Sequence, residues 1–150
     1  KIRELDPSRP VYVEAESRSV GRLRVPPRVW NAMQAAPRLE IRAPVAERAR
    51  YLMTAYPDLP DDPDKLLAAI DGLRRFHARS VIEEWQALAG RGDWQALAAA
   101  LVTAHYDPAY DRARKRDDAA LSRTILETGS LDDRALAGLA ERVIAATPAA

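Results

Sequence analysis

The stretch "RLEIRAPVAERARYLMTAY", Arg38 to Tyr56, decides the fold class. Its first part alternates the apolar Leu39 and Ile41 with charged residues, which is typical of a short strand with one buried face. Pro44 then begins a helical pattern, and proline is tolerated in the first turn of a helix. The stretch therefore predicts a strand that is followed directly by a helix. The helix residues that we expect to turn at least partly inward are Val45, Tyr51, Leu52 and Tyr56.

The same order of strand and helix is found on both sides of this stretch. Upstream, Val11 to Val13 have the composition of a short buried strand, and Pro26 and Pro27 can open a helix. Downstream, Thr124 to Leu126 predict a strand that stops at Gly129, and Ser130 with Asp133 can cap a last helix. Strands that alternate with helices favour an α/β fold with a parallel sheet. Only three strands are found, so we expect a partial sheet.

The middle of the chain predicts three successive helices. Asp62 before a proline makes an N-cap, Ser80 with Glu83 matches a capping box, and Asp93 can cap the third helix. The apolar residues at helical spacing are Leu66, Ile70, Leu73, Val81, Ile82, Trp85, Leu88, Trp94, Leu97, Leu101 and Val102. The chain is thus expected to be predominantly helical. Its expected parts are an α/β part over residues 1–56, a helical insertion over 57–118, and a last strand and helix over 119–150 that return to the α/β part.

Composition excludes several classes of protein. At 150 residues, with 47% apolar and 30% charged residues, the chain has the size and balance of one soluble globular domain. The absence of cysteine excludes disulfides and thiol catalysis within it. No apolar run has the length of a membrane span and the polar first residues carry no signal segment, so we expect a cytoplasmic protein with no membrane partner. The net charge is only +1, and we attribute the dominance of arginine over lysine mainly to coding bias.

The segment "VEAESRSVG", Val13 to Gly21, places polar residues where the first predicted strand ends. In open α/β sheets, ligands bind at the carboxyl ends of the strands. Glu14, Glu16 and Arg18 are therefore candidate ligand-binding residues. Two alternatives stay open: the charges are solvated where the strand leaves the core, or Arg18 merely pairs with one of the two glutamates.

A second segment, "HYDPAYDRARKR", runs from His105 to Arg116. Asp107 with the following proline is a turn former, so Tyr106 and Tyr110 either close a helix end or lie beside a ligand or a base. His105 falls on the apolar stripe of the preceding helix, which favours a core or boundary position. The cations that follow suit phosphate contacts; they are Arg112, Arg114, Lys115 and Arg116.

A further group of basic residues surrounds His77. Arg74, Arg75 and Arg79 lie close to it in the sequence and form a basic surface that either contacts RNA or is simply solvated. Arg48 and Arg50 lie on the helix after the second predicted strand, where P-loop kinases often place arginines that face phosphate, which is an analogy at the level of the fold.

The two segments together resemble the C-terminal part of the bacterial tRNA 2-selenouridine synthases. That family has a segment like "EDESR-x-IG" followed by "LP", and later a "YYDP-x-Y" element with basic residues behind it. The matching residues here are Glu14, Glu16, Ser17, Arg18, Gly21, Val25, Pro26, Tyr106, Asp107, Pro108 and Tyr110. The resemblance extends over essentially the whole chain. It departs from the family at Ala15, where an aspartate is common, and at "KRDDAALS", which is not a close match.

The resemblance implies an architecture as well as a function. The family resembles a rhodanese-like domain with a catalytic cysteine, followed by a P-loop kinase-like domain with a Walker A sequence. This chain contains neither feature, so it is similar to the second half of the P-loop domain with its helical region. The implied partners are those two missing segments and the anticodon stem-loop of tRNA. The partial parallel sheet agrees with this interpretation.

The implied reaction replaces sulfur by selenium in the wobble 2-thiouridine of tRNA. Selenophosphate is the implied donor, and a geranylated intermediate made from geranyl diphosphate is associated with the family. The chain alone is expected to be inactive. Two alternatives remain: a non-catalytic RNA-binding module, and a fragment of a small-molecule P-loop kinase. A steep salt dependence of binding would indicate RNA, whereas dependence on Mg²⁺ would indicate a diphosphate pocket.

The resemblance also implies roles for individual residues. A carboxylate at the end of a strand beside the P-loop corresponds to the Walker B position, which holds Mg²⁺ or orients water at the phosphates. Glu14 or Glu16 would take the catalytic role, with Glu16 as the slightly favoured metal ligand. The residues assigned to substrate or phosphate are Ser17, Arg18, Gly21, Arg48, Tyr106, Asp107 and Tyr110. Those assigned to tRNA are Arg74, Arg75, Arg79, Arg112, Arg114, Lys115 and Arg116.

Overall fold

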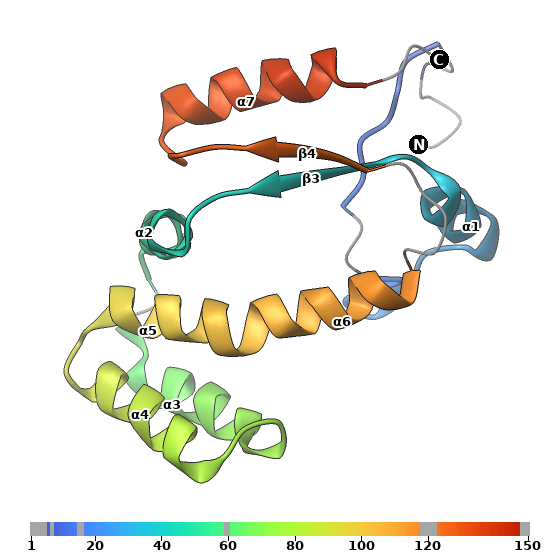
Figure 1. Ribbon diagram of the computed structural model, residues 1–150. Helices are drawn as coiled ribbons and strands as arrows, with labels where there is room; N and C mark the ends of the chain where they lie inside the picture. Colours follow the sequence, from blue (N-terminus) through green and yellow to red (C-terminus); the bar gives the residue numbers. More distant parts are fainter. Residues whose placement is uncertain (1–5, 7, 15–16, 59–60, 118–122, 148–150) are drawn as a thin grey trace.

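A computed structural model describes residues 6, 8–14, 17–58, 61–117 and 123–147, with the backbone alone described at residues 20 and 113–117. It is mostly helical with a small parallel sheet (Figure 1). Along the chain the elements are β1 (Ser19–Val20), β2 (Leu23–Arg24), α1 (Pro27–Ala35), β3 (Arg38–Arg42), α2 (Val45–Ala55), α3 (Pro63–Asp71), the 3₁₀ turn η3 (Gly72–Arg75), α4 (Arg79–Gly90), α5 (Trp94–Leu101), the π-helical turn η4 (Val102–Tyr106), α6 (Asp107–Asp117), β4 (Arg123–Glu127) and α7 (Asp133–Ala145).

The predicted parallel pairing is confirmed between β3 and β4. Arg38 lies opposite Arg123 at one end of the register, and Arg42 lies opposite Glu127 at the other. Helix α7 runs along one side of this strand pair, and α2, α5 and α6 lie on the other side (Figure 1). The carboxyl ends of both strands therefore meet at one edge, close to the start of α2.

The predicted strand at Val11–Val13 is wrong. These three residues belong to no strand, and their side chains are exposed. A short run of this kind needs a neighbouring strand to form a sheet, and none lies beside it in the described part of the chain. Instead, the Tyr12 hydroxyl forms a 2.6 Å hydrogen bond with the Thr147 hydroxyl, just after α7.

A short antiparallel hairpin, β1–β2, follows that segment and was not predicted. Val20 pairs with Leu23, which leaves Gly21 and Arg22 as a two-residue loop. Gly21 has a φ of +58°, and it occupies the first loop position, where type II′ hairpins require glycine. No described atom lies within 4 Å of where a Cβ would be, so backbone conformation, not a close contact, explains the glycine.

The expected buried faces of β3 and α2 are only partly present. Leu39 is half-buried and Leu126 on β4 is buried, but Ile41, opposite Leu126, is largely exposed. Tyr51 and Tyr56 are also exposed, contrary to the prediction. The reason is that β3 has a single neighbouring strand within the described residues, so little covers this side of the sheet.

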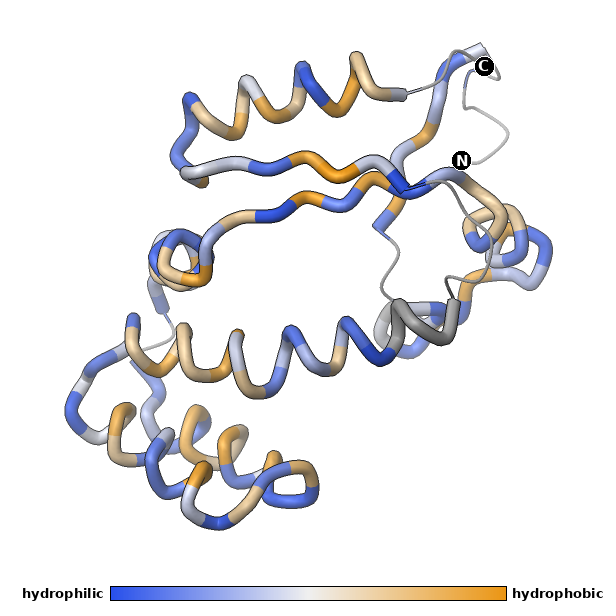
Figure 2. The backbone as a smooth tube through the Cα atoms, in the orientation of Figure 1, coloured by the Kyte–Doolittle hydropathy of each residue, from blue (hydrophilic) through white to orange (hydrophobic). Residues whose placement is uncertain are grey.

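The helical middle contains the main hydrophobic core. Helices α3, α4 and α5 pack around Ile70, Ile82, Trp85, Leu88, Ala89 and Leu97, which confirms the predicted apolar stripes. Figure 2 shows hydrophobic positions along these helices and along β3 and β4. Among the described helices, none is long and apolar enough to cross a membrane.

The helix caps test the sequence signals one by one. Asp62 accepts a hydrogen bond from the Lys65 N–H, and Asp93 accepts one from the Ala96 N–H, as predicted. The capping box at Ser80 is wrong, because α4 begins at Arg79 after Ala78 and has no side-chain cap. Glu83 pairs with Arg79 instead, at 2.6 Å.

The predicted cap of α7 is shifted within the same loop. Asp132, not Ser130, caps this helix and accepts a hydrogen bond from the Ala135 N–H. The predicted boundaries of the three parts, after residues 56 and 118, stay a prediction. Helices α3, α4 and α5 fall within the expected insertion, and β4 and α7 fall within the expected last part.

Candidate functional site

A two-fold hydrogen-bonded ion pair joins two of the predicted site residues, Arg48 on α2 and Asp107 at the start of α6. The Arg48 Nη1 and Nη2 donate to the two carboxylate oxygens of Asp107 at 2.8 and 2.7 Å. The side chains are 34% and 41% exposed, and the hydrogen bonds that Arg48 donates to Asp107 raise the pKa of Arg48. The Arg48 Nε is buried and has no hydrogen-bond partner among the described residues. This fork geometry fixes α6 relative to α2.

The π-helical turn η4 leads directly into Asp107. One interpretation of the sequence placed a turn at Asp107–Pro108. The chain instead continues as a helix from α5 through η4 into α6. Proline lacks the N–H that an α-helix would use, and the turn directly before Pro108 is the wider π form. Such turns are frequent at functional sites.

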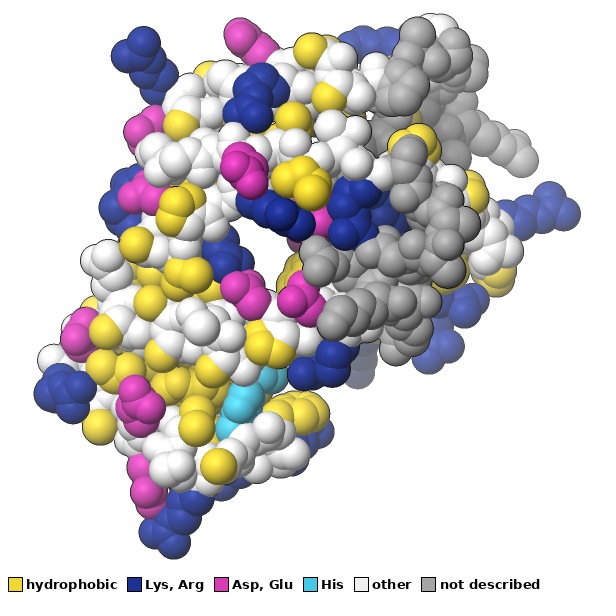
Figure 3. Space-filling model, in the orientation of Figure 1, with side chains coloured by type: hydrophobic (Ala, Val, Ile, Leu, Met, Phe, Trp, Pro, Cys, Tyr) yellow, Lys and Arg dark blue, Asp and Glu magenta, His cyan; other side chains and the backbone are white. Residues whose placement is uncertain are grey.

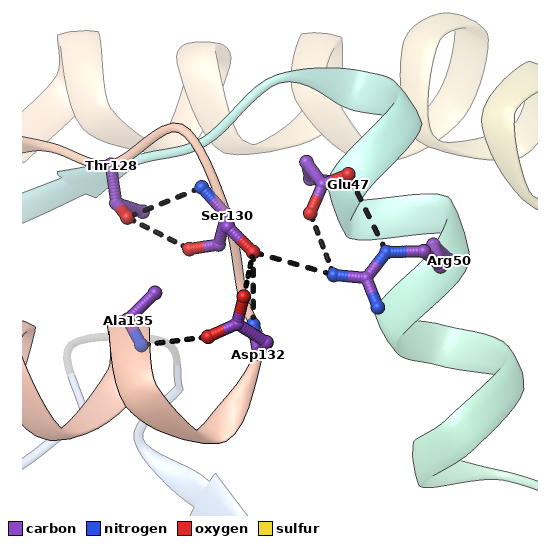
Figure 4. A network of polar contacts seen from close by, with 6 residues as sticks. All are labelled: Glu47, Arg50, Thr128, Ser130, Asp132 and Ala135. Carbon is purple, nitrogen blue, oxygen red and sulfur yellow. Dashed lines mark hydrogen bonds and ion pairs between the residues drawn. The ribbon is translucent and has the colours of Figure 1, made fainter.

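A second polar network lies at the carboxyl edge of the sheet (Figure 4). The Arg50 guanidinium donates to Glu47 at 2.7 Å and to the Ser130 hydroxyl at 3.5 Å. The Ser130 hydroxyl donates to Asp132 at 2.8 Å, and that carboxylate caps α7. The network therefore connects the starts of α2 and α7.

Charges in this network are stabilised by their neighbours. The hydrogen bond from Arg50 lowers the pKa of Glu47, and the Ala135 N–H and the Ser130 hydroxyl lower that of Asp132. Arg50 was a candidate from its place in the sequence, whereas Glu47 and Asp132 were not. The signal available was their position, because both lie in the first turns after the two parallel strands.

The residues of the first motif lie elsewhere. Glu14, Ser17 and Arg18 are exposed, and the Ser17 hydroxyl accepts a hydrogen bond from the Ser19 N–H at 3.0 Å. Their segment lies toward the end where β3 and β4 begin, opposite the carboxyl edge (Figure 1). The structure therefore does not bring Glu14 to the Arg48–Asp107 pair, and Glu16 lies outside the described residues.

The residues predicted to bind tRNA occupy two elements. Arg74 and Arg75 belong to η3 and Arg79 begins α4; Arg74 pairs with Asp71, and the Arg75 guanidinium lies 4.6 Å from the centre of the Phe76 ring. The second group follows along α6. Its described side chain, Arg112, is exposed, and those of Arg114, Lys115 and Arg116 lie outside the described residues.

A pair of histidines brings these two elements together. His77 Nε2 and His105 Nδ1 are 2.9 Å apart, and both side chains are half-buried. Burial, His77 and Arg112 lower the pKa of His105. The boundary position predicted for His105 is confirmed. His77 does not lie on an open basic surface but packs edge-on against the buried Trp85, with ring centres 4.8 Å apart.

A pocket and the distribution of histidine and acidic side chains bear on the remaining site predictions. A shallow pocket of about 370 Å³ between α2 and α5 is lined mostly by alanines and contains none of the predicted site residues. The described residues hold no group of three or more His, Asp or Glu side chains placed to bind a metal ion. The Mg²⁺ site stays a prediction, since Glu16 is not described.

Comparison with known families gives one match. Residues 2–79 match the family described as the tRNA 2-selenouridine synthase AAA domain. The match covers just over half of the chain, including the first motif, Arg48 and the basic residues around His77. No curated protein and no solved structure matches significantly.

Proposed function

Because this chain belongs to the family of the tRNA 2-selenouridine synthase AAA domain, we propose that it is part of a cytoplasmic enzyme that replaces sulfur by selenium in the wobble 2-thiouridine of tRNA. In this proposal the complete enzyme uses selenophosphate and passes through a geranylated intermediate made from geranyl diphosphate. The family match carries the proposal. The "YDPAY" segment lies beyond the matched residues and supports it through its resemblance to the family.

The small sheet supports the idea that this chain supplies only the second half of a P-loop domain. Parallel sheets are normally covered on both faces and have more than two strands. Here β3 and β4 pair only with each other among the described residues, and Ile41 and Ile125 are 51% and 43% exposed on them. We propose that strands of the Walker A-bearing segment extend this sheet, and that a rhodanese-like domain supplies the catalytic cysteine.

The Arg48–Asp107 pair suggests how the site responds to its substrate. Like a carboxylate, a diphosphate can accept two parallel hydrogen bonds from one guanidinium, so it competes with Asp107 for Arg48. Tyr106 and Tyr110 lie on the same segment as Asp107, and a change at the pair would be transmitted to them. Ser17, Arg18 and Gly21 remain proposed phosphate contacts.

A magnesium ion fits the donor set of the first motif. Mg²⁺ is commonly held through one or two carboxylates together with substrate phosphates. Glu16, with Glu14 as the alternative, supplies such a carboxylate, and Glu14 is exposed and accessible. When bound, the ion would neutralise the charge of the leaving diphosphate.

Selenium incorporation tests this proposal directly. We would measure conversion of wobble 2-thiouridine with the chain alone, and with the chain supplied together with the cysteine-bearing and Walker A-bearing segments. We expect no turnover with the chain alone and turnover with the combination. Turnover by the chain alone would contradict the proposal that other segments supply the cysteine and the Walker A sequence. Inactivity of a properly assembled combination would contradict the proposed function.

A non-catalytic RNA-binding module is the second candidate. It is favoured by the exposed Tyr106 and Tyr110 beside Arg112. Binding to a 2-thiouridine anticodon stem-loop and to its unmodified form separates the two candidates. A module that contacts phosphates alone would bind both RNAs equally and lose affinity steeply with salt.

A further inference from the structure

We propose that the corner where η3 meets η4 and the start of α6 is a stacking surface for unpaired RNA bases, separate from the carboxyl edge of the sheet. The proposal rests on the proposed function only in taking tRNA as the RNA. We call this surface the aromatic corner, and its residues are Phe76, His105, Tyr106 and Tyr110 with Arg75 and Arg112.

Three large aromatic side chains are exposed together at this corner. Phe76, Tyr106 and Tyr110 are 57%, 55% and 49% exposed. The centre of the His105 ring is 5.8 Å from that of Phe76 and 5.9 Å from that of Tyr106. Tyr110 follows Tyr106 by about one helical turn and so lies on the same face. The rings of Phe76, His105 and Tyr106 thus form a series of neighbours that joins two elements distant in the sequence.

The histidine pair holds this series in place. His77 Nε2 is hydrogen-bonded to His105 Nδ1 at 2.9 Å. The His77 ring packs against Trp85, which is almost fully buried in the helical core. Phe76 and Tyr106, the neighbours of these histidines in the sequence, are thereby fixed relative to each other. A surface that is already ordered loses little conformational entropy when a ligand binds.

Positive charge flanks the exposed rings. Arg75 lies over the Phe76 ring, and neither Arg75 nor Arg112 forms an ion pair with any side chain that the structure describes. Figure 3 shows the histidines at the surface between hydrophobic and basic side chains. Aromatic rings with nearby arginines bind single-stranded nucleic acid by stacking on bases and contacting phosphates.

Acidic residues also lie close to this surface: Asp107 and Asp111, on α6, directly follow Tyr106 and Tyr110, and Asp107 is paired with Arg48. Asp71 pairs with Arg74, and Glu83 pairs with Arg79 at 2.6 Å. All four side chains are about half exposed or more, and ion pairs of this kind are weak. The combination favours unpaired bases over a duplex, because the bases of a duplex are already stacked on each other.

Binding of two small RNAs to the chain tests this proposal. One RNA is a hairpin with an unpaired loop, and the other is a blunt duplex of equal length and charge; affinities are measured by fluorescence anisotropy. We expect Phe76→Ala and Tyr106→Ala each to weaken hairpin binding about fivefold or more, with duplex binding unchanged. The conservative Phe76→Tyr and Tyr106→Phe should bind like the unchanged chain, because they keep the stacking face.

Tyr56→Ala is the matched control, since Tyr56 is 60% exposed but follows α2, outside the aromatic corner. Circular dichroism establishes that each variant is folded. The proposal is overturned if the chain does not bind the hairpin or binds both RNAs equally, if the two alanine variants bind as the unchanged chain does, or if Tyr56→Ala weakens binding as much.

Selenium incorporation by the assembled enzyme separates this proposal from the proposed function. If the assembled enzyme incorporates selenium but the alanine variants bind the hairpin as the unchanged chain does, the proposal of a stacking surface is wrong and the proposed function stands. If the alanine variants selectively lose hairpin binding but the assembled enzyme incorporates no selenium, the stacking surface is supported and the proposed function is wrong.

Discussion

Arg48 and Asp107, 59 residues apart in the sequence, form a two-fold hydrogen-bonded ion pair that connects α2 to α6. Both residues were assigned to substrate or phosphate binding from the sequence. The partial exposure of the pair limits its strength, and its fork geometry places it at the upper end of surface ion pairs.

We therefore expect Arg48→Gln and Asp107→Asn each to lower the free energy of unfolding by about 1 kcal/mol. The double variant should be little less stable than either single variant, because both remove the same interaction. Urea denaturation of the four proteins measures this coupling. Additive losses would mean that the pair contributes no interaction energy.

Acidification should destabilise the protein through His105. The folded protein lowers the pKa of His105 below the ordinary value of 6.5, so the unfolded chain binds more protons as the pH falls below that value. Stability is then fully present above about pH 6.5 and is lost as the pH falls through the folded pKa.

Thermal melting between pH 7 and 5 measures this effect. His105→Asn should flatten the dependence of the melting temperature on pH, although it lowers the melting temperature itself. The carboxylates with lowered pKa, Asp6, Glu47 and Asp132, act mainly below this range. An unchanged slope in the variant would assign the pH dependence to other groups.

The side-chain cap of α7 should add about 1 kcal/mol to the free energy of unfolding. Asp132 accepts the Ala135 N–H, so Asp132→Ala leaves that donor without its partner, whereas Asp132→Asn keeps an acceptor. Asp133→Ala is the matched control, since Asp133 is the adjacent carboxylate inside the helix and does not cap it. Chemical denaturation should rank Asp132→Ala as the least stable of the three, and equal losses at both positions would contradict the cap.

The helical core should be sensitive to loss of volume. Ile82 is fully buried between α3, α4 and α5, and we expect Ile82→Ala to cost about 2–5 kcal/mol. Ile144→Ala provides the control, because Ile144 is largely exposed on α7 and should change stability little. A similar cost at both positions, measured by urea denaturation, would show that burial does not set the difference.

Local sequence signals predicted the fold well where the decisive contacts are local. The stripe of Ile70, Ile82 and Trp85 repeats at helical spacing, and the caps at Asp62 and Asp93 act within one turn. The same approach failed at Val11–Val13, because a strand exists only if another strand lies beside it. Composition cannot supply that partner.

Contacts across long sequence distances explain what was missed in the candidate site. Nothing near Arg48 in the sequence indicates that its guanidinium pairs with Asp107. His77 was predicted to belong to a basic surface, because the sequence does not show that Trp85 and His105 lie beside it. The family resemblance, in contrast, was recognisable from short motifs, and the family match confirms it.

The pairing of Arg38 with Arg123 closes the helical middle of the chain into one large loop. Contacts within α3, α4 and α5 are close in sequence and form early, whereas β3 and β4 must find each other across that whole loop. The entropic cost of closing a loop grows only slowly with its length. We therefore expect the helical middle to tolerate insertions and deletions at little cost in stability, and the strand pair to form after the helices.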